Sequence, residues 1–341
     1  MSYIDLRSDT VTKPSPAMRR AMADATVGDD DYVEDLTVKK LEEMCSEMLG
    51  TEAALFVSSG TQSNLLALMS HCERGEEYIA GQEAHCYSHE GGGAAILGSI
   101  QPQPLDFETD GTLDLHKVEE AIKPEDRHFA RTRLICLENT QSGKVLPLAY
   151  FPSCKELADK HKLKLHLDGA RLFNAAVRDR VGLKDISRYF DSISICLSKG
   201  LGAPVGSVLC ASAELIAKAR RWRKVLGGGM RQAGILAAAG IFALQENVDR
   251  LEEDHEKASV LAKGLQDIEK LRIDLDHVQT NMVFAQIKDG GRSDLQDHMQ
   301  RAGILVHNGI NLRLVTHLDV KLEDINYVID TFKDYFARVS H

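Results

Sequence analysis

The sequence has no cysteine pairs and no long hydrophobic segment. Its seven cysteines are an odd number, scattered from Cys45 to Cys210 without a Cys-x-x-Cys pair. This pattern argues against a disulfide framework and a structural zinc site, and it indicates a reducing compartment. The longest apolar run, 233–244, is too short to cross a bilayer, and the N-terminus lacks the apolar stretch of a signal peptide. We therefore expect a cytoplasmic protein that is not bound to a membrane.

Positive charge is also in deficit. The chain has 41 basic against 51 acidic residues and a formal net charge of −10, which disfavours general nucleic-acid binding. One segment, 219–231, concentrates basic residues beside a glycine triplet. Such a run is usually a solvated face, but the adjoining glycines also suggest close backbone approach to a phosphate. The basic residues of this segment are Arg220, Arg221, Arg223, Lys224 and Arg231.

Short apolar runs alternate with helical patterns over the first two thirds of the chain, which predicts an α/β domain with a largely parallel sheet and helices on both faces. We expect an N-terminal arm over 1–30, a large domain over 31–251 and a small α+β domain over 252–341, with an unusually long, broken helical stretch at 232–271. The expected strands of the large domain are 53–57, 77–81, 94–97, 134–137, 163–167, 193–197 and 205–210.

Lys199 is the most informative residue. It follows the apolar run 193–197 and precedes Gly200, so it is not a typical solvated surface charge. Asp168 ends another apolar run 31 residues earlier. A carboxylate and a lysine at two strand ends fit a pyridoxal phosphate site, in which the lysine amine bonds the cofactor aldehyde and the aspartate keeps the ring nitrogen protonated. The alternative for Asp168 is a turn or helix cap after a strand.

The segment Ser58-Ser-Gly-Thr-Gln62 follows an expected strand and opens a helix. Gly60 permits a tight turn, and free N–H groups at the helix start, around Thr61, suit a phosphate. The competing interpretation is an ordinary Ser/Thr helix cap.

His85 lies in a loop after the expected strand 77–81, where an aromatic ring stacks on a cofactor and moves protons near neutral pH. Glu90 is placed to orient a histidine. The alternative is a half-exposed loop histidine. His85 and His89 lack a third ligand, so we expect no metal site.

Two arginines are candidates for an anion. Arg171 follows Asp168 within one turn and suits two-pronged binding of a carboxylate. Arg313 alternates with apolar residues, which fits either an inward arginine awaiting an anion or a sheet-edge arginine.

Taken together, these motifs resemble the low-specificity L-threonine aldolases over nearly the whole chain, from residue 3 to about 336. The resemblance is carried by Leu6-Arg-Ser-Asp-Thr-Val-Thr12, Gly28-Asp-Asp, Ser59-Gly-Thr-Gln, His85, Glu138-Asn-Thr, Leu167-Asp-Gly-Ala-Arg171, Leu197-Ser-Lys-Gly-Leu-Gly202, Gly227-Gly-Gly-Met-Arg-Gln232 and Arg313-Leu-Val-Thr-His317.

The resemblance implies the aspartate-aminotransferase-like fold (fold type I), with a seven-stranded sheet, and a homotetramer built from dimers that share active sites. It implies reversible cleavage of L-threonine and L-allo-threonine to glycine and acetaldehyde. It assigns Lys199 and Asp168 as above, His85 to ring stacking, and Gly60 and Thr61 to the phosphate loop. It further assigns Ser8, Arg171 and Arg313 to the substrate carboxylate, His128 to a second site histidine, and Lys224 and Arg231 to a neighbouring subunit's phosphate.

The general base for the substrate hydroxyl is left open between His85, His128 and a water held by either. Other functions also stay open. A β-eliminating lyase would use the same Lys199 and Asp168 with another substrate pocket. An aminotransferase would exchange amino groups with an oxo acid. A nucleic-acid-binding protein would use the basic segment and leave Lys199 unexplained.

Overall fold

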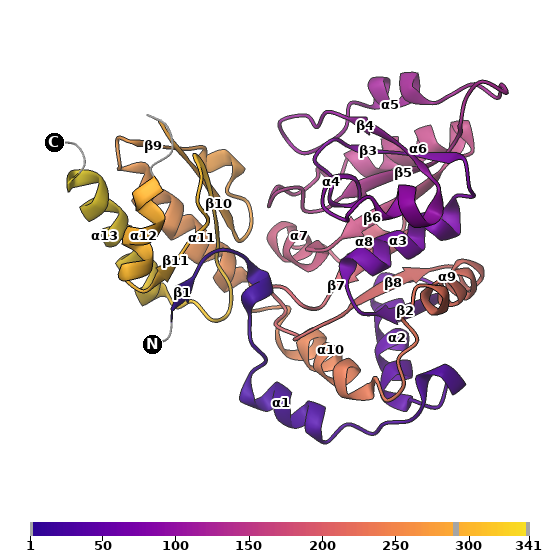
Figure 1. The fold of residues 1–341 in the computed structure, drawn as a ribbon, viewed down its shortest axis with the longest axis horizontal. Helices are drawn as coiled ribbons and strands as arrows, with labels where there is room; N and C mark the ends of the chain where they lie inside the picture. Colours follow the sequence, from indigo (N-terminus) through magenta and orange to yellow (C-terminus); the bar gives the residue numbers. More distant parts are fainter. Residues whose placement is uncertain (1–2, 289–292, 339–341) are drawn as a thin grey trace.

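A seven-stranded sheet with helices on both faces forms the larger part of the molecule (Figure 1). The computed structural model describes residues 3–288 and 293–338; the ends of the predicted arm and small domain, 1–2 and 339–341, lie outside the described residues. The strand order is β2-β8-β7-β6-β5-β3-β4, and only β8 runs antiparallel to its neighbours. The expected mostly parallel α/β fold is therefore confirmed. The strands are β2 (Ala53–Val57), β3 (Glu76–Gly81), β4 (Gln101–Leu105), β5 (Arg131–Glu138), β6 (Lys164–Gly169), β7 (Ser192–Cys196) and β8 (Ser207–Ala211).

The two faces of this sheet are covered by different helices. One face carries α3 (Gly60–His71), the short α4 (His85–Ser88) and α9 (Ala213–Val225). The other face carries the largest hydrophobic core, to which helices from both ends of the chain contribute. Its helices are α1 (Pro16–Ala23), α2 (Leu36–Leu49), α5 (Leu115–Ala121), α6 (Tyr150–His161), α7 (Leu172–Asp179), α8 (Leu183–Ser187) and α10 (Gly234–Glu246).

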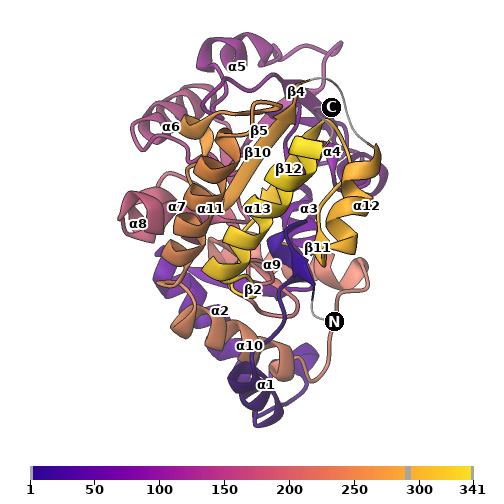
Figure 2. The ribbon, with the colours of Figure 1, turned by 90° about the vertical axis from the view of Figure 1, so that its left-hand side faces the viewer.

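The C-terminal elements form a second core beside the first (Figures 1 and 2). A three-stranded antiparallel sheet, in the order β12-β10-β9, packs with three helices, and β1 (Ile4–Asp5) pairs in parallel with β11 (Ile304–Leu305). The N-terminal segment therefore reaches this second core, where Leu6 is fully buried. The predicted boundary at residue 252 stays a prediction. The remaining elements are α11 (Leu251–Gln266), β9 (Leu271–Ile273), β10 (Met282–Ile287), α12 (Ser293–Arg301), β12 (Asn311–Val315) and α13 (Leu322–Arg338).

Most expected elements are confirmed, including the long broken stretch, which forms α10 and α11. The strand predicted at 94–97 is wrong, because Ala94–Gly98 forms a short π-helical turn whose Ala94 and Gly98 pack toward α3. A brief apolar run does not by itself distinguish strand from helix. The edge strand β4 was not expected because it contains two prolines, which the ladder tolerates at a sheet edge.

Within residues 3–288 and 293–338, no helix has both the length and the apolarity needed to cross a membrane. All seven cysteines are buried and free.

Candidate active site

The carboxyl ends of three adjacent strands bring the chemistry-bearing residues together. Glu138 ends β5, Asp168 lies beside it in register near the end of β6, and Lys199 follows β7. Ligands of open α/β sheets bind at this edge, where successive strands deliver their terminal side chains to one place. The backbone N–H of His85 donates to Glu138 Oε2 at 2.9 Å, which ties α4 to the same edge.

Asp168 is a buried carboxylate, with 5 % of its surface exposed. Asn64 Nδ2 donates to its Oδ2 at 2.7 Å, and the Ala170 N–H donates to its Oδ1 at 3.0 Å. No side chain in residues 3–288 or 293–338 forms a salt bridge with it. Burying a charge without a cation is costly, so this carboxylate is suited to a positively charged partner from outside the chain.

Glu90 orients the ring of His85, as the sequence indicated. His85 Nδ1 lies 2.8 Å from Glu90 Oε1, and Asn64 Nδ2 donates to the same oxygen at 2.7 Å. The hydrogen bond that His85 donates to Glu90 raises the pKa of His85, while burial raises the pKa of Glu90. His85, Glu90 and Asp168 place possible metal-ligating atoms within 4.8 Å of one another, but hydrogen bonds already use Glu90 Oε1 and both oxygens of Asp168.

Lys199 lies on the tight connection between β7 and β8, and it is half-buried. Its carbonyl accepts hydrogen bonds from the Gly202 N–H at 2.8 Å and from Thr12 Oγ1 at 3.0 Å. Gly202 has φ +78°, a left-handed conformation that favours glycine. The Lys199 charge acts on Asp9 and Glu138, although burial is the largest influence on the pKa of both carboxyls.

The two predicted arginines lie close enough for the charge of Arg171 to lower the pKa of Arg313. Arg171 makes a two-pronged contact with Asp9, through Nε at 2.8 Å and Nη2 at 2.6 Å. Burial is the largest single influence and raises the pKa of Asp9, but the charge and hydrogen bond of Arg171, with smaller help from Lys199 and Asn281, together lower the pKa to about 2. Arg171 therefore uses its fork on a carboxylate of the chain itself.

Arg313 is the guanidinium with spare capacity. Its Nη2 donates to the Arg7 carbonyl at 3.1 Å, while its buried Nε has no hydrogen-bond partner in the described chain. Burial, and then the Arg171 charge, lower its pKa. Two guanidinium groups beside the single carboxylate of Asp9 leave an excess of positive charge, which suits a second carboxylate.

The start of α3 has the form expected of a phosphate loop. Ser59 caps the helix, with its Oγ accepting from the Gln62 N–H at 3.1 Å. The N–H groups of Gly60 and Thr61 have no preceding helical turn to bond. Gly60 is required for close approach rather than for a tight turn, because a Cβ there would lie 2.9 Å from Cys196 Sγ. Both interpretations from the sequence, helix cap and anion site, therefore apply to this turn.

Four predicted site residues stand apart from this cluster in the single chain. Lys224 and Arg231 pair with Asp31 and Asp29, at 2.8 and 3.0 Å. Ser8 Oγ caps a short turn by accepting from Thr10, beside the Asp9 that holds Arg171.

His128 is the fourth. It precedes β5, at the opposite end of that strand from Glu138, and its exposed ring lies 2.5 Å from Asp126. Eight strand residues separate the two ends by roughly 25 Å. His128 therefore does not line the site of its own chain, and any catalytic role requires a second copy.

The basic segment is largely neutralised by acidic partners. Arg223 is not on a solvated face: it is buried and pairs with Asp30 at 2.7 Å while donating to the Phe56 carbonyl. Arg220 pairs with Glu42 at 2.8 Å. With Lys224 and Arg231 also paired, four of the five basic residues have acidic partners, which weakens the field expected of a nucleic-acid patch.

Sequence reasoning missed several residues that support the site. Asn64 contacts both Glu90 and Asp168, Asp9 holds Arg171, and Glu138 holds α4. A signal for Asn64 was present, since it is an amide directly before the apolar run 65–69 of the expected helix. Asp9 and Glu138 were visible only as members of longer motifs.

Comparisons with known proteins agree with this architecture. The family model described as "Beta-eliminating lyase" matches residues 5–288. The low specificity L-threonine aldolase of Escherichia coli (strain K12) is 53 % identical over 335 residues, covering 98 % of this chain and all of the relative. The probable low-specificity L-threonine aldolase 2 of Arabidopsis thaliana is 47 % identical over 98 % of this chain and 97 % of its own.

Solved structures give the same fold. Threonine aldolase of Leishmania major superposes with a TM-score of 0.84 at 22 % identity, over 98 % of this chain and 99 % of that one. A putative L-allo-threonine aldolase of Listeria monocytogenes has a TM-score of 0.79 at 18 % identity, over 96 % and 95 %. The fold and the family match thus place the chain among the lyases of the family described as "Beta-eliminating lyase". Within that class, the chain belongs to the low-specificity L-threonine aldolase family.

Proposed function

We propose that this protein cleaves L-threonine and L-allo-threonine to glycine and acetaldehyde, reversibly, with pyridoxal 5'-phosphate bonded to Lys199. The observation that carries the proposal is the buried carboxylate of Asp168, which has no salt bridge in residues 3–288 and 293–338 and lies at the same strand-end edge of the sheet as Lys199. Full-length identity of 53 % to a low specificity L-threonine aldolase supports the substrate class.

The residues present fit the cofactor. A protonated ring nitrogen would supply the positive partner that Asp168 lacks among the described residues, and the N-terminus of α3 suits the phosphate. The bound cofactor supplies an electron sink that stabilises negative charge at the substrate Cα. Lys199 would hold the cofactor, with Asp168, Gly60 and Thr61 at its two ends and His85 against the ring.

The arginine pair would hold the substrate carboxylate, with Arg313 as the direct contact through its unpartnered Nε. Arg171, which Asp9 holds in place, adds positive charge at the same position. Ser8 precedes Asp9 in the sequence. Holding the carboxylate fixes rotation about Cα, so that the Cα–Cβ bond takes the orientation that breaks. Such orientation contributes several kcal/mol to catalysis.

His85 is our first candidate for the base that accepts the hydroxyl proton at Cβ. Its Nδ1 is engaged by Glu90, which leaves Nε2 as the ring nitrogen without a partner in the described chain. The alternatives are His128 or a water held by either histidine. His128 could act only from a neighbouring subunit. His85→Phe and His128→Phe, made separately, distinguish them; near-normal turnover in both variants would exclude both.

The experiment that tests the function is product analysis with Lys199→Ala as control. The purified protein with pyridoxal phosphate should release acetaldehyde from L-threonine and from L-allo-threonine, and Lys199→Ala should lose the activity and the visible absorbance. Sulfide release from cysteine without acetaldehyde from threonine would favour the β-eliminating alternative, which the family description keeps in view. Borohydride-trapped cofactor on another lysine would refute the role of Lys199.

We also propose that the protein is a cytoplasmic homotetramer whose sites are shared between subunits. The exposed, acid-paired positions of Lys224 and Arg231, the distant position of His128 and seven free cysteines support this arrangement. Sedimentation of Arg231→Ala with its cofactor occupancy tests it. A monomeric wild-type protein with full activity would contradict it.

A further inference from the structure

A chain of buried polar side chains leads from Asp168 through the layer between α3 and the sheet. Asn64 Nδ2 lies 2.7 Å from Asp168 Oδ2, and Asn64 Oδ1 lies 3.1 Å from His166 Nε2. His166 Nδ1 lies 2.8 Å from Ser192 Oγ, and the same hydroxyl lies 2.8 Å from His71 Nε2. None of the steps above uses His166, Ser192 or His71.

Two strands and one helix face build this chain. Asn64 and His71 are seven residues apart on α3, so they project from one side of the helix. His166 and Ser192 are register partners on β6 and β7, and Asp168 follows His166 on the same face of β6. The five residues are thus positioned by regular secondary structure and not by loops.

The hydrogen bonds have one direction. The NH₂ group of Asn64 faces two carboxylates, Asp168 and Glu90, so its carbonyl oxygen must face His166. That oxygen only accepts, which makes His166 Nε2 the donor and Nδ1 the acceptor. The Ser192 hydroxyl therefore donates to His166.

His71 completes the same direction. Because the Ser192 hydroxyl donates its hydrogen bond to His166, its oxygen accepts one from His71 Nε2–H. Both histidines are neutral near pH 7, because burial lowers the pKa of His71 to about 3 and that of His166 to about 4. Each of the four hydrogen bonds that link His71 to Asp168 is therefore donated in the direction of Asp168.

We propose that His71, Ser192 and His166 are positioning residues that hold Asn64 in the one orientation that donates to Asp168 and keeps this carboxylate aimed at the cofactor ring nitrogen; this inference rests on the proposed function. The chain is not a proton conduit, because the Asn64 amide does not relay a proton at neutral pH. It acts through orientation and aligned dipoles, which strengthen one another in a low-dielectric interior.

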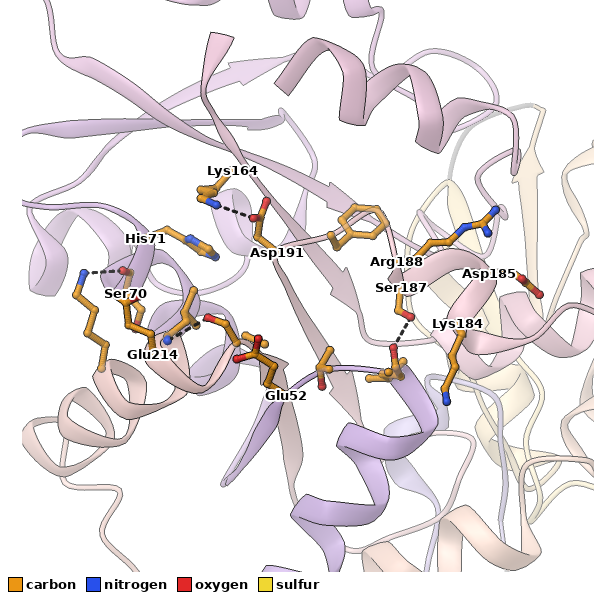
Figure 3. A pocket seen from close by; sticks show the side chains of 18 residues that line it. Glu52, Ser70, His71, Lys164, Lys184, Asp185, Ser187, Arg188, Asp191 and Glu214 are labelled. Atoms are coloured by element: carbon orange, nitrogen blue, oxygen red, sulfur yellow. Dashed lines mark hydrogen bonds and ion pairs between the residues drawn. The ribbon is translucent and has the colours of Figure 1, made fainter. Parts of the chain in front are cut away.

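The far end of this hydrogen-bonded series, at His71, borders a cavity of about 730 Å³ (Figure 3). The cavity lies where β6 and β7 begin, since Lys164 and Asp191 line it, whereas Asp168 lies near the end of β6. His71 lines the cavity, among the charges of Lys164, Asp191 and Lys218. His71 is the member of the chain nearest to solvent, so substitutions there disturb packing least.

The first experiment reads the tautomer of His166 in the cofactor-free protein by ¹⁵N NMR of its ring nitrogens. We expect Nε2 protonated and Nδ1 accepting at pH 7, with the signal assigned by its loss in His166→Gln. Ser192→Ala should shift it. Ser194→Ala is the matched control, since Ser194 lies on the same strand, is buried and has an Oγ without a partner. Protonation at Nδ1, or a charged ring at pH 7, would overturn the proposal.

The second experiment measures the dissociation constant of pyridoxal phosphate. Ser192→Ala should weaken binding roughly tenfold, as expected for disrupted hydrogen bonding to a charged group, while Ser194→Ala matches wild type. His71→Leu should weaken it less, and His71→Gln, which keeps an N–H donor, should restore it. Equal affinity of Ser192→Ala and Ser194→Ala would overturn the positioning role alone. A wild-type protein that binds no pyridoxal phosphate would instead refute the proposed function.

Discussion

Strands β6 and β7 present two buried faces of opposite character. Toward the large core they show Leu165, Leu167, Ile193 and Ile195, which pack among apolar side chains. Toward α3 they show a polar set that is equally inaccessible to solvent, and its members are His166, Asp168, Ser192 and Ser194. Alternation of this kind ordinarily indicates a strand with one face in water. When a helix covers the polar face instead, the alternation marks a site, in which all the members here except Ser194 are held by hydrogen bonds to one another or to Asn64 of the helix.

The faces also differ in what holds them together. The hydrophobic packing on the apolar face is non-directional, and it stabilises the fold in proportion to the apolar area that is buried. The polar face depends on each hydrogen bond being made, because an unpaired buried group is costly. We therefore expect changes on the apolar face to alter stability and changes on the polar face to alter the cofactor site.

The largest effect is expected from Asp168→Asn. Removing the charge should reduce turnover by about 10²–10³-fold, as for other losses of a pre-organised electrostatic contact. Stability of the cofactor-free protein should hold or rise, since Asp168 raises the pKa of both Glu90 and Glu138 by repulsion. Acetaldehyde release and thermal unfolding of the apoprotein are the two measurements. A large loss of stability without loss of turnover would abolish the distinction between the faces.

The matched change on the apolar face is Leu167→Ala, one residue away and fully buried. Truncating a buried leucine costs about 2–5 kcal/mol of unfolding free energy. Denaturant unfolding measures the cost, and turnover per folded molecule should remain within a fewfold of wild type. If Asp168→Asn instead lost mainly stability and Leu167→Ala lost mainly turnover, the face on which a residue lies would not determine its role.

Much of this contrast was accessible from the sequence. Asp168 and Lys199 are readable because strand ends in an α/β fold converge, and Glu90 is readable because it lies five residues from His85. His166 was visible in the run that ends at Asp168, but nothing local says that the face it shares with Asp168 is covered by α3. The partnership of Arg171 with Asp9 spans 162 residues and is fixed only by packing.

A smaller effect is expected on how the stability of the protein depends on pH. The pKa of His166 is lowered from 6.5 to about 4 by burial, so between these values the unfolded chain binds more protons than the folded one. The stability gained from the neutral ring is complete above about pH 6.5 and is lost as pH falls toward 4. The Asp9–Arg171 pair behaves otherwise, because the lowered pKa of Asp9, about 2, keeps its contribution until pH falls below its unfolded value.

Thermal unfolding of the apoprotein between pH 7.5 and 4.5 tests this order. The melting temperature should fall across that window, and His71→Gln, which removes the second buried imidazole, should flatten the fall. A wild-type melting temperature that is constant down to pH 4.5 would mean that the buried histidines are already charged or are not buried in solution.

The smallest expected effects come from substituting Gly60 and Gly240. These glycines pack against Cys196 and Leu197, the last residue of β7 and the residue that follows it. A Cβ at Gly60 would lie 2.9 Å from Cys196 Sγ under α3, and a Cβ at Gly240 would lie 2.8 Å from Leu197 Cδ1. In each Gly→Ala variant, overpacking of about 1–3 kcal/mol is partly offset by about 1 kcal/mol of helix propensity. Gly240→Ala should therefore lose a little stability and keep its affinity for pyridoxal phosphate. Gly60→Ala should lose affinity as well, because the displaced first turn of α3 carries the N–H groups that we assign to the phosphate. Titration of both variants with pyridoxal phosphate decides it, and equal affinities would place the phosphate elsewhere.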